Sequence, residues 1–195
     1  MQRRLSSLER ENEALRTEVE RLSRYRDLAY RDELTRTFNR RYLEARARDA
    51  LAPSFRGLGT GLVLVDVDRF KSINDRFGHA AGDGVLRRVA QTVGQRARRN
   101  DAVGRWGGDE FYVLLPHTHA AGVRSFVERL TVDLSEIVVI PTQKEAERVS
   151  CSVGLAHAPE DGSTLEELFA AADRRMYAAK DRVRRLDRPR ASSAA

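Results

Sequence analysis

The sequence predicts an α/β fold in which a roughly five-stranded, mostly antiparallel sheet is wrapped by helices and preceded by a coiled-coil helix. Three observations lead to this fold class. Five short apolar runs have the β-branched and aromatic composition of buried strands. Two pairs of these runs are joined by segments that favour hairpins, which connect antiparallel strands. Apolar residues recur at helical spacing between the runs, and a heptad repeat occupies the N-terminal region.

Residues 1–29 are predicted to form a coiled-coil helix for signalling and dimerisation. The residues that carry the repeat are alternately 3 and 4 apart, and they are Leu5, Leu8, Asn12, Leu15, Val19 and Leu22. This spacing is an a/d heptad stripe, in which an asparagine at an a position favours a parallel two-stranded register. The alternative is a single amphipathic helix that packs on its own domain. The regular spacing favours the coiled coil and hence a homodimer.

Residues 30–186 are predicted to form one globular domain, and residues 187–195 a disordered tail. Helices are expected at about 39–51, 83–99, 120–134 and 165–184, and strands at 61–67, 101–106, 111–115, 137–140 and 149–156. Pro53 would end the first of these helices, and Ser163 or Thr164 would cap the last. The final two strands are expected to pair with each other around residues 143–147.

The composition is typical of a globular protein, since 41% of the 195 residues are hydrophobic and 33% are charged. The apolar runs are too short to span a membrane, and the charged N-terminus does not resemble a secretion signal. We therefore expect a cytoplasmic protein with no membrane partner. Cys151 is the single cysteine, which excludes an internal disulfide, and its strand-like surroundings indicate a packed core thiol. The net charge of +6 favours anionic partners such as nucleotides or nucleic acid.

The stretch from Asp101 to Leu115 contains the first candidate site. Gly107 and Gly108 are predicted to form a two-residue hairpin turn, because glycine tolerates the positive φ that such turns need. Asp109 and Glu110 would then lie at the hairpin tip. Two adjacent carboxylates repel each other and would be stabilised by a divalent cation. On the hairpin alone, a solvated turn is the more common explanation of such residues.

A second carboxylate pair favours the metal site over the solvated turn. Asp66 and Asp68 end the strand predicted at residues 61–67, and residues two apart on a strand share a face. Palm-type polymerases and nucleotide cyclases hold two metals with a strand-end Asp-x-Asp beside an acidic hairpin tip. Such metals polarise a nucleoside triphosphate and activate an attacking 3′-hydroxyl. The two carboxylate pairs together predict phosphoryl-transfer chemistry.

Several segments in a fixed order resemble the GGDEF-domain diguanylate cyclase family over about residues 30–186. The run from Asp66 to Asp83 is similar to the family signature D-x-D-x-FK-x-x-ND-x-x-GH-x-x-GD, and Gly107 to Phe111 is the GGDEF motif unaltered. The other matching segments are residues 31–35, 39–41 and 172–180. The resemblance implies a sandwich related to the nucleotidyl-cyclase and palm folds. It also implies an enzyme that condenses two GTP into cyclic di-GMP and two pyrophosphates.

The resemblance further implies how the metal and the reacting groups are handled. Asp66, the Val67 backbone carbonyl, Asp109 and Glu110 would hold two Mg²⁺ or Mn²⁺ ions in each active site. Asp109 or Glu110 would help to deprotonate the 3′-hydroxyl, and both candidates for this role stay open.

Other positions would bind GTP. Asn74 and Asp83 would hydrogen-bond guanine, whose N1–H and amino edge suits a carboxylate acceptor, and His79 would support the loop around the base. The triphosphate would be neutralised by the backbone around Phe70 and by the side chains of Lys71, Lys180 and Arg184. The spacing of four between the last two places them on one helical face.

A separate inhibitory site is implied by Arg98 and Asp101, an R-x-x-D that precedes Gly107 by the spacing usual in this family. Arg129 matches the position from which a second arginine joins bound cyclic di-GMP. The alternative is a basic helix end at residues 96–99 that faces solvent.

The chain departs from the family pattern in two places. Arg36-Thr37 stands where the family usually has Gly-Leu, and Val183-Arg184-Arg185 stands where it usually has Gly-Arg-Asn. The departures fall at the approach of the coiled coil and at the end of the phosphate clamp, and neither affects the metal or guanine positions.

Two other classes of function compete with the enzyme. A catalytically silent receptor that binds nucleotide or cyclic di-GMP on the same fold would be expected to have a damaged hairpin tip, and this tip is intact. A coiled-coil nucleic-acid-binding dimer would carry its basic block beside the heptads, whereas the arginine excess here lies at the far end of the domain. We therefore predict a diguanylate cyclase with GTP as substrate, cyclic di-GMP as product and inhibitor, and no nucleic-acid partner.

Overall fold

The structure, a computed structural model, describes residues 2–52, 58–139 and 147–186. Its central sheet has five strands in the order β1-β3-β4-β2-β7. These strands are β1 (Phe38–Asn39), β2 (Thr60–Val67), β3 (Ala102–Gly107), β4 (Glu110–Pro116) and β7 (Cys151–Ala158). β1 is parallel to β3, and the other neighbouring pairs are antiparallel. The predicted mostly antiparallel sheet is therefore confirmed.

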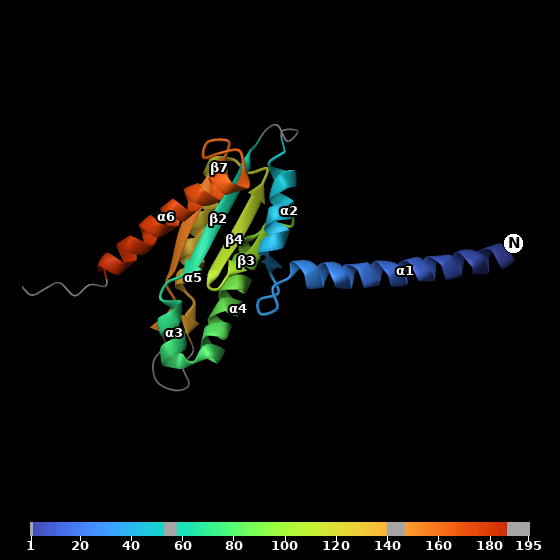
Figure 1. Ribbon diagram of the computed structural model, residues 1–195, viewed down its shortest axis with the longest axis horizontal. Helices are drawn as coiled ribbons and strands as arrows, with labels where there is room; N and C mark the ends of the chain where they lie inside the picture. Colours follow the sequence, from blue (N-terminus) through green and yellow to red (C-terminus); the bar gives the residue numbers. More distant parts are fainter. Residues whose placement is uncertain (1, 53–57, 140–146, 187–195) are drawn as a thin grey trace, which may run out of the picture.

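Helices cover both faces of this sheet, and one helix extends away from it (Figure 1). The helices are α1 (Gln2–Tyr30), α2 (Arg40–Ala50), α3 (Phe70–Phe77), α4 (His79–Arg96), α5 (Ala120–Ser135) and α6 (Leu165–Leu186). α1 is the projecting helix, and its heptad residues Leu8, Leu15, Val19 and Leu22 are exposed. None of the helices in the described ranges is both long enough and apolar enough to cross a membrane.

The core has two layers because β2 and β4 are buried on both faces. Val63 and Val113 point to one layer, which α4 and α5 complete, and Leu62 and Leu114 point to the other, which α2 and α6 complete. This burial explains why both strands are continuous apolar runs instead of alternating ones. Cys151 packs at the border of the first layer, and burial raises the pKa of its thiol to about 12, as expected of a packed, unreactive cysteine.

The hairpin turn lies one residue later than predicted. Gly107 pairs with Glu110, so the two-residue loop is Gly108-Asp109 and not Gly107-Gly108. The reason is a β-bulge between Arg105 and Gly107, which shifts the register by one residue. Asp109 is therefore a loop residue, and Glu110 is the first residue of β4.

The predicted pairing of the last two strands is right only at its start, where Val149 N–H donates to the Ile137 carbonyl at 2.8 Å, and is wrong from Cys151 onward. β5 (Val138–Val139) pairs with β6 (Glu147–Arg148) in a separate two-stranded sheet. β7 instead lies antiparallel to β2 along its whole length. The eight paired positions of β2 and β7 bury far more apolar surface than a short hairpin could.

Helix boundaries agree with expectation at most ends. α2 begins after Asn39, whose side chain accepts a hydrogen bond from Tyr42 N–H at 3.2 Å, and Thr164 caps α6 by accepting from Glu167 N–H. α4 spans His79–Arg96 instead of 83–99, because Gly78 at φ +83° ends α3 and allows a new helix to begin at once. The expectations for Pro53, for residues 143–146 and for a disordered tail at 187–195 lie outside the described residues.

Candidate active site

The two predicted carboxylate pairs meet where β2 ends and β4 begins. Asp66 is paired directly with Glu110 across these strands. Val67 N–H donates a hydrogen bond to the Asp109 carbonyl at 3.3 Å, which closes the ladder at the hairpin tip. Because paired residues on neighbouring strands point to the same face, antiparallel pairing brings the strand-end and hairpin motifs together.

Buried negative charge is concentrated at this point. Asp66 is only 5% exposed, and its pKa is raised to about 6, chiefly by burial and also by the charges of Asp109 and Glu110. Lys180 opposes the shift, because its Nζ lies 2.6 Å from Asp66 Oδ2. Burial is also the main cause that raises the pKa of Glu110, with contributions from Asp109 and Asp173. A cation at this place would relieve the repulsion.

The oxygen atoms that these residues offer are suitable ligands for a hard divalent cation. Asp66, Val67 and Asp109 line a cleft of about 240 Å³ together with Phe70, Lys71 and Lys180. Carboxylate and carbonyl oxygens are the ligands that Mg²⁺ prefers, and Mg²⁺ commonly takes only one or two carboxylates, with water and phosphate oxygens as its other ligands. In the described part of the chain, no three acidic, histidine or cysteine side chains are close enough to form a complete protein cage.

Asp68 lies in the turn after β2 and, like Asp66, lines the cleft, but its environment is different. Its two carboxylate oxygens accept hydrogen bonds from the hydroxyls of Ser150 and Ser152 at 2.6 and 2.7 Å. These serines join β7 to the end of β2, and the sequence pattern did not single them out. Asp68 thus anchors the loop that follows the metal-binding candidates.

The predicted guanine-binding residues lie where α3 packs on α4. Asn74 Oδ1 is buried and has no hydrogen-bond partner among the described residues. A Cβ atom at Gly82 would lie 1.9 Å from this oxygen, so only glycine leaves room for it. Asp83 is half-buried beside this position, and His79 is exposed at the first turn of α4. An unpaired buried amide costs free energy, and a ligand with polar edges would satisfy it.

The predicted phosphate-binding residues surround the same cleft. Phe70 and Lys71 begin α3, and Lys180 reaches the cleft from α6. The backbone of Arg184 lies one helical turn beyond Lys180, but its side chain is not among the described parts of the chain. The cleft therefore combines acidic groups that suit a cation with basic groups that suit phosphate.

The residues predicted to bind inhibitor lie away from the cleft, on the elements that cover the opposite layer. Arg98 and Asp101 connect α4 to β3, where the Asp101 carboxylate accepts from the Arg98 backbone N–H at 2.6 Å. Arg98 is exposed, and so is Arg129 on α5. α4 and α5 are held together next to this place by an ion pair between Arg96 and Asp133.

The comparisons with known proteins agree on one family. The model of the family described as "Diguanylate cyclase, GGDEF domain" matches residues 29–185. The bifunctional diguanylate cyclase/cyclic di-GMP phosphodiesterase MucR of Pseudomonas aeruginosa is 36% identical over 181 residues, which are 92% of this chain and 26% of MucR. Diguanylate cyclase DgcM of Escherichia coli is 40% identical over 120 residues, 62% of this chain and 28% of DgcM. The chain thus spans about a quarter of the length of these curated relatives.

Solved structures agree with the sequence relatives. Diguanylate cyclase SiaD of Pseudomonas aeruginosa, solved with its activator SiaC, superposes with a TM-score of 0.76 at 34% identity, covering 92% of this chain and 69% of SiaD. The coiled coil and GGDEF domain of DgcB from Caulobacter crescentus, solved with c-di-GMP, gives a TM-score of 0.76 at 30% identity, covering 91% and 93%. The second comparison includes a coiled coil as well as the domain.

Proposed function

This chain belongs to the GGDEF diguanylate cyclase family, and we propose that it condenses two GTP molecules into cyclic di-GMP with release of two pyrophosphates. The observation that carries the proposal is the pairing of Asp66 with Glu110 beside an intact Gly-Gly-Asp-Glu-Phe hairpin. The acidic side chains of Asp66 and Asp109 and the basic side chains of Lys71 and Lys180 line one cleft next to this pairing, which supports the proposal. The names of the curated relatives support the same reaction.

In the proposed reaction, the 3′-hydroxyl of one GTP attacks the α-phosphorus of the other. An oxygen–phosphorus bond forms, the bond from the α-phosphorus to the bridging oxygen breaks, and pyrophosphate leaves with that electron pair. The hydroxyl proton would go to Asp109, which lines the cleft, or to Glu110, which is paired with Asp66 across β2 and β4. The 3′-hydroxyl of the second GTP then attacks the α-phosphorus of the first in the same way, which closes the ring and releases the second pyrophosphate.

Two Mg²⁺ or Mn²⁺ ions held by Asp66, the Val67 carbonyl, Asp109 and Glu110 would supply charge stabilisation for the triphosphate and lower the pKa of the hydroxyl. Lys180 contacts Asp66 in the free protein. On GTP binding it would exchange this carboxylate for a phosphate oxygen, together with Lys71 and Arg184. Binding of guanine would pair the amide of Asn74 and the carboxylate of Asp83.

A homodimer follows from the chemistry, because each domain offers one GTP site and the product joins two GTP by two bonds. The exposed heptad residues of α1 are suited to a parallel coiled coil between two copies. DgcB, whose solved structure includes a coiled coil, supports this arrangement by analogy.

The enzyme is tested by incubating the purified chain with GTP and Mg²⁺ or Mn²⁺, and by measuring cyclic di-GMP and pyrophosphate. Two pyrophosphates per cyclic di-GMP are expected, with no product in EDTA and none from ATP. Binding of GTP without turnover under these conditions would instead assign the chain to the silent receptors of the family.

Feedback by product is proposed at Arg98, Asp101 and Arg129. Progress curves should slow as cyclic di-GMP accumulates, and Arg98→Ala should relieve the slowing while the initial rate is kept. Arg99→Ala is the matched control, because Arg99 is a neighbouring exposed arginine outside the proposed site. Curves that bend identically in wild type and Arg98→Ala would exclude this inhibitory site.

A further inference from the structure

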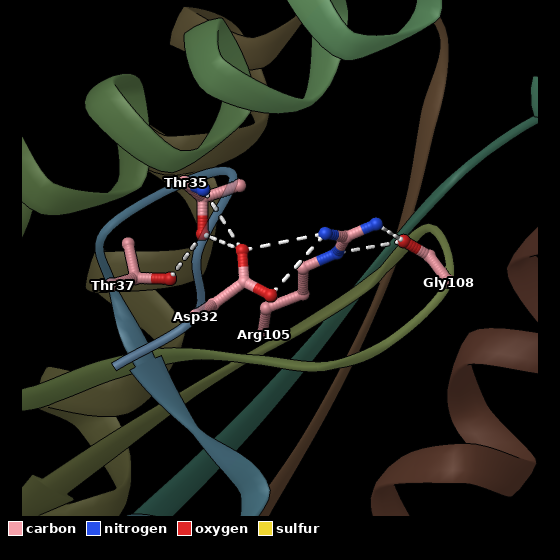
Figure 2. A network of polar contacts seen from close by, with 5 residues as sticks. All are labelled: Asp32, Thr35, Thr37, Arg105 and Gly108. Atoms are coloured by element: carbon pink, nitrogen blue, oxygen red, sulfur yellow. Dashed lines mark hydrogen bonds and ion pairs between the residues drawn. The ribbon is translucent and has the colours of Figure 1, made fainter. Parts of the chain in front are cut away.

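One guanidinium joins the turn after α1 to the hairpin tip, although the two segments are 73 residues apart. Arg105 Nη1 lies 3.3 Å from both carboxylate oxygens of Asp32. Its Nε and Nη2 donate to the Gly108 carbonyl at 2.8 and 2.5 Å (Figure 2). The Arg105 and Asp32 side chains are only 17% and 22% exposed, so water screens this contact weakly.

The turn at residues 31–37, which we call the exit turn, is built around the Asp32 carboxylate. Its Oδ1 accepts hydrogen bonds from the Thr35 N–H at 2.8 Å and from the Thr35 hydroxyl at 2.7 Å. Backbone bonds from Asp32 N–H to Thr37 O and from Arg36 N–H to Asp32 O close the turn. Burial would raise the pKa of Asp32, but the bonds from Thr35 and the charge of Arg105 outweigh burial and lower this pKa. The carboxylate is therefore ionised at neutral pH.

The exit turn also accommodates the unusual Arg36-Thr37 pair. Arg36 has φ +60°, a conformation in which glycine would be unstrained and an arginine is strained. The Thr37 hydroxyl lies 2.8 Å from the Thr35 hydroxyl and extends the network by one member (Figure 2). The turn thus keeps its shape through side-chain hydrogen bonds where the family's usual glycine is absent.

The hairpin tip has little packing of its own. Within the described part of the chain, side chains built at Gly107 or Gly108 would extend into open space. Gly108 has φ +55°, and a bulge precedes it. The Gly108 carbonyl belongs to the peptide that leads into Asp109. Fixing this oxygen fixes the peptide plane from which the Asp109 side chain departs.

The exit turn connects the end of α1 to β1 and α2, and two contacts hold these flanking segments together. Asp32 follows the last residue of α1 by two positions. The Asn39 side-chain amide donates to the Ala29 carbonyl at 2.9 Å, and the ring of Tyr30 packs edge-on against Tyr42 at 5.6 Å. A change in the direction of α1 would therefore shift the exit turn, and Asp32 with it.

We propose that Arg105 is a positioning residue that couples the exit turn to the Gly108–Asp109 peptide, so that the arrangement of α1 reaches Asp109. This role rests on the proposed function, in which Asp109 acts at the metal and the hydroxyl. Arginine suits the task because its planar fork donates to two partners in a fixed geometry, which lysine does not. In this way a change in dimer geometry would alter the position of Asp109 at the hairpin tip through the single side chain of Arg105.

Amide hydrogen exchange tests the coupling without any need for turnover. In the full chain, Asp32→Asn keeps the size of the side chain but removes the charge that holds Arg105. We expect exchange of the peptide covering residues 107–111 to become about tenfold faster in this variant. Arg175→Ala is the matched control, because Arg175 also bridges a backbone carbonyl and an aspartate, Leu155 O and Asp161, far from the tip. Unchanged exchange at the tip in Asp32→Asn would overturn the coupling.

Steady-state kinetics tests the consequence for catalysis. Arg105→Ala should lower kcat by about tenfold or more with little change in KM for GTP, because guanine and phosphate are bound by other residues. Arg105→Lys should not restore kcat, and Asp32→Asn should add nothing in the Arg105→Ala background. Full rescue by lysine would show that only charge matters and would overturn the positioning role.

The two experiments separate the two proposals. If the wild-type chain forms no cyclic di-GMP but Asp32→Asn still speeds exchange at the tip, the proposed function is rejected and the coupling stands. An active wild type whose tip exchange does not respond to Asp32→Asn would reject the coupling and leave the proposed function standing.

Discussion

The buried carboxylate of Asp66 is held at a cost to stability. Burial and two negative neighbours raise its pKa to about 6, so the ionised form is disfavoured in the free protein. Sites that accept such a cost in the folded state are commonly functional. Asp109, by contrast, lies in the hairpin loop, where no core packing depends on it. The two acids should therefore respond differently to mutation.

Asp109→Asn should abolish synthesis of cyclic di-GMP and leave the fold intact. We expect the rate to fall by at least about a hundredfold, since a charge that acts on the reacting groups is lost. The free energy of unfolding should change by no more than about 0.5 kcal/mol, as for other changes outside the core. Product formation and thermal unfolding check the two parts, with Asp49→Asn on the exposed face of α2 as control. Retained turnover would remove Asp109 from the active site.

Asn74 offers a test of guanine recognition. Leucine is nearly the same size as asparagine, so Asn74→Leu keeps the packing and removes a buried oxygen that has no hydrogen-bond partner among the described residues. The free protein should therefore be as stable as wild type or more stable by about 1 kcal/mol. Binding of GTP should weaken by about tenfold, and the preference for GTP over ATP should shrink, because the base loses its partner. Asp83→Ala should reduce the same preference.

Competition of ATP against GTP measures this selectivity, and chemical denaturation measures the stability. A large loss of stability in Asn74→Leu would indicate a structural hydrogen bond instead. Unchanged selectivity in both the Asn74 and the Asp83 variants would place the guanine site elsewhere.

At the scale of elements, α6 connects the hydrophobic core to the cleft that contains Asp66. Leu168, Ala172 and Met176 pack on the sheet, while Lys180 on the same helix reaches Asp66. The start of the helix is fixed by Thr164 and Glu167, whose carboxylate accepts from the Ser163 and Thr164 N–H groups. The position of Lys180 therefore follows from how the first two-thirds of the helix pack.

Arg175 secures α6 to the end of β7, and its contribution should depend on pH. Hydrogen bonds from Arg175 are the main cause that lowers the pKa of Asp161 below its ordinary 3.8. A lowered carboxylate pKa adds stability that is present above the unfolded pKa and is lost as pH falls through the folded pKa. Arg175→Ala should cost roughly 1 kcal/mol at pH 7, because the arginine is half exposed.

The cost of Arg175→Ala should therefore shrink when the pH is lowered from 7 to below about 4. Denaturant titrations of wild type and variant at both pH values give the difference. A difference in stability that stays constant over this range would mean that packing, and not the ion pair, gives Arg175 its effect.

At the scale of the whole molecule, the chain consists of a compact domain and a projecting helix. α1 extends away from the domain (Figure 1), and its side chains Leu8, Leu15, Val19 and Leu22 are exposed. A short heptad stripe forms only a marginal coiled coil. Association and activity should therefore depend on protein concentration.

Leu15→Lys should weaken this association, because it places a charge at a d position of the stripe. We expect specific activity at low protein concentration to fall by about tenfold and to recover as the concentration is raised. Thr17→Lys is the matched control, since it adds the same charge two residues later on the outer face of the helix. Sedimentation and turnover over a dilution series measure both effects. Full activity in a Leu15→Lys variant shown to be monomeric would contradict the dimer.

Much of the architecture was determined by local sequence alone. The heptad stripe predicts α1, the apolar run after Gly61 predicts β2, and the capping residues predict the start of α6. These features depend on periodicity and turn chemistry within a few residues, which the sequence displays directly. The acidic residues of the cleft were found in the same way, since they stand at a strand end and at a hairpin tip.

Tertiary structure alone decided how distant segments pair. β7 joins β2 instead of β5, and a one-residue bulge moves Asp109 into the loop. The contacts of Lys180 with Asp66 and of Arg105 with Asp32 join residues that no local pattern relates. Strand partners and buried ion pairs are selected by the total apolar surface that is buried and by the desolvation of charge. Both quantities exist only once the whole chain has folded, so sequence spacing cannot express them.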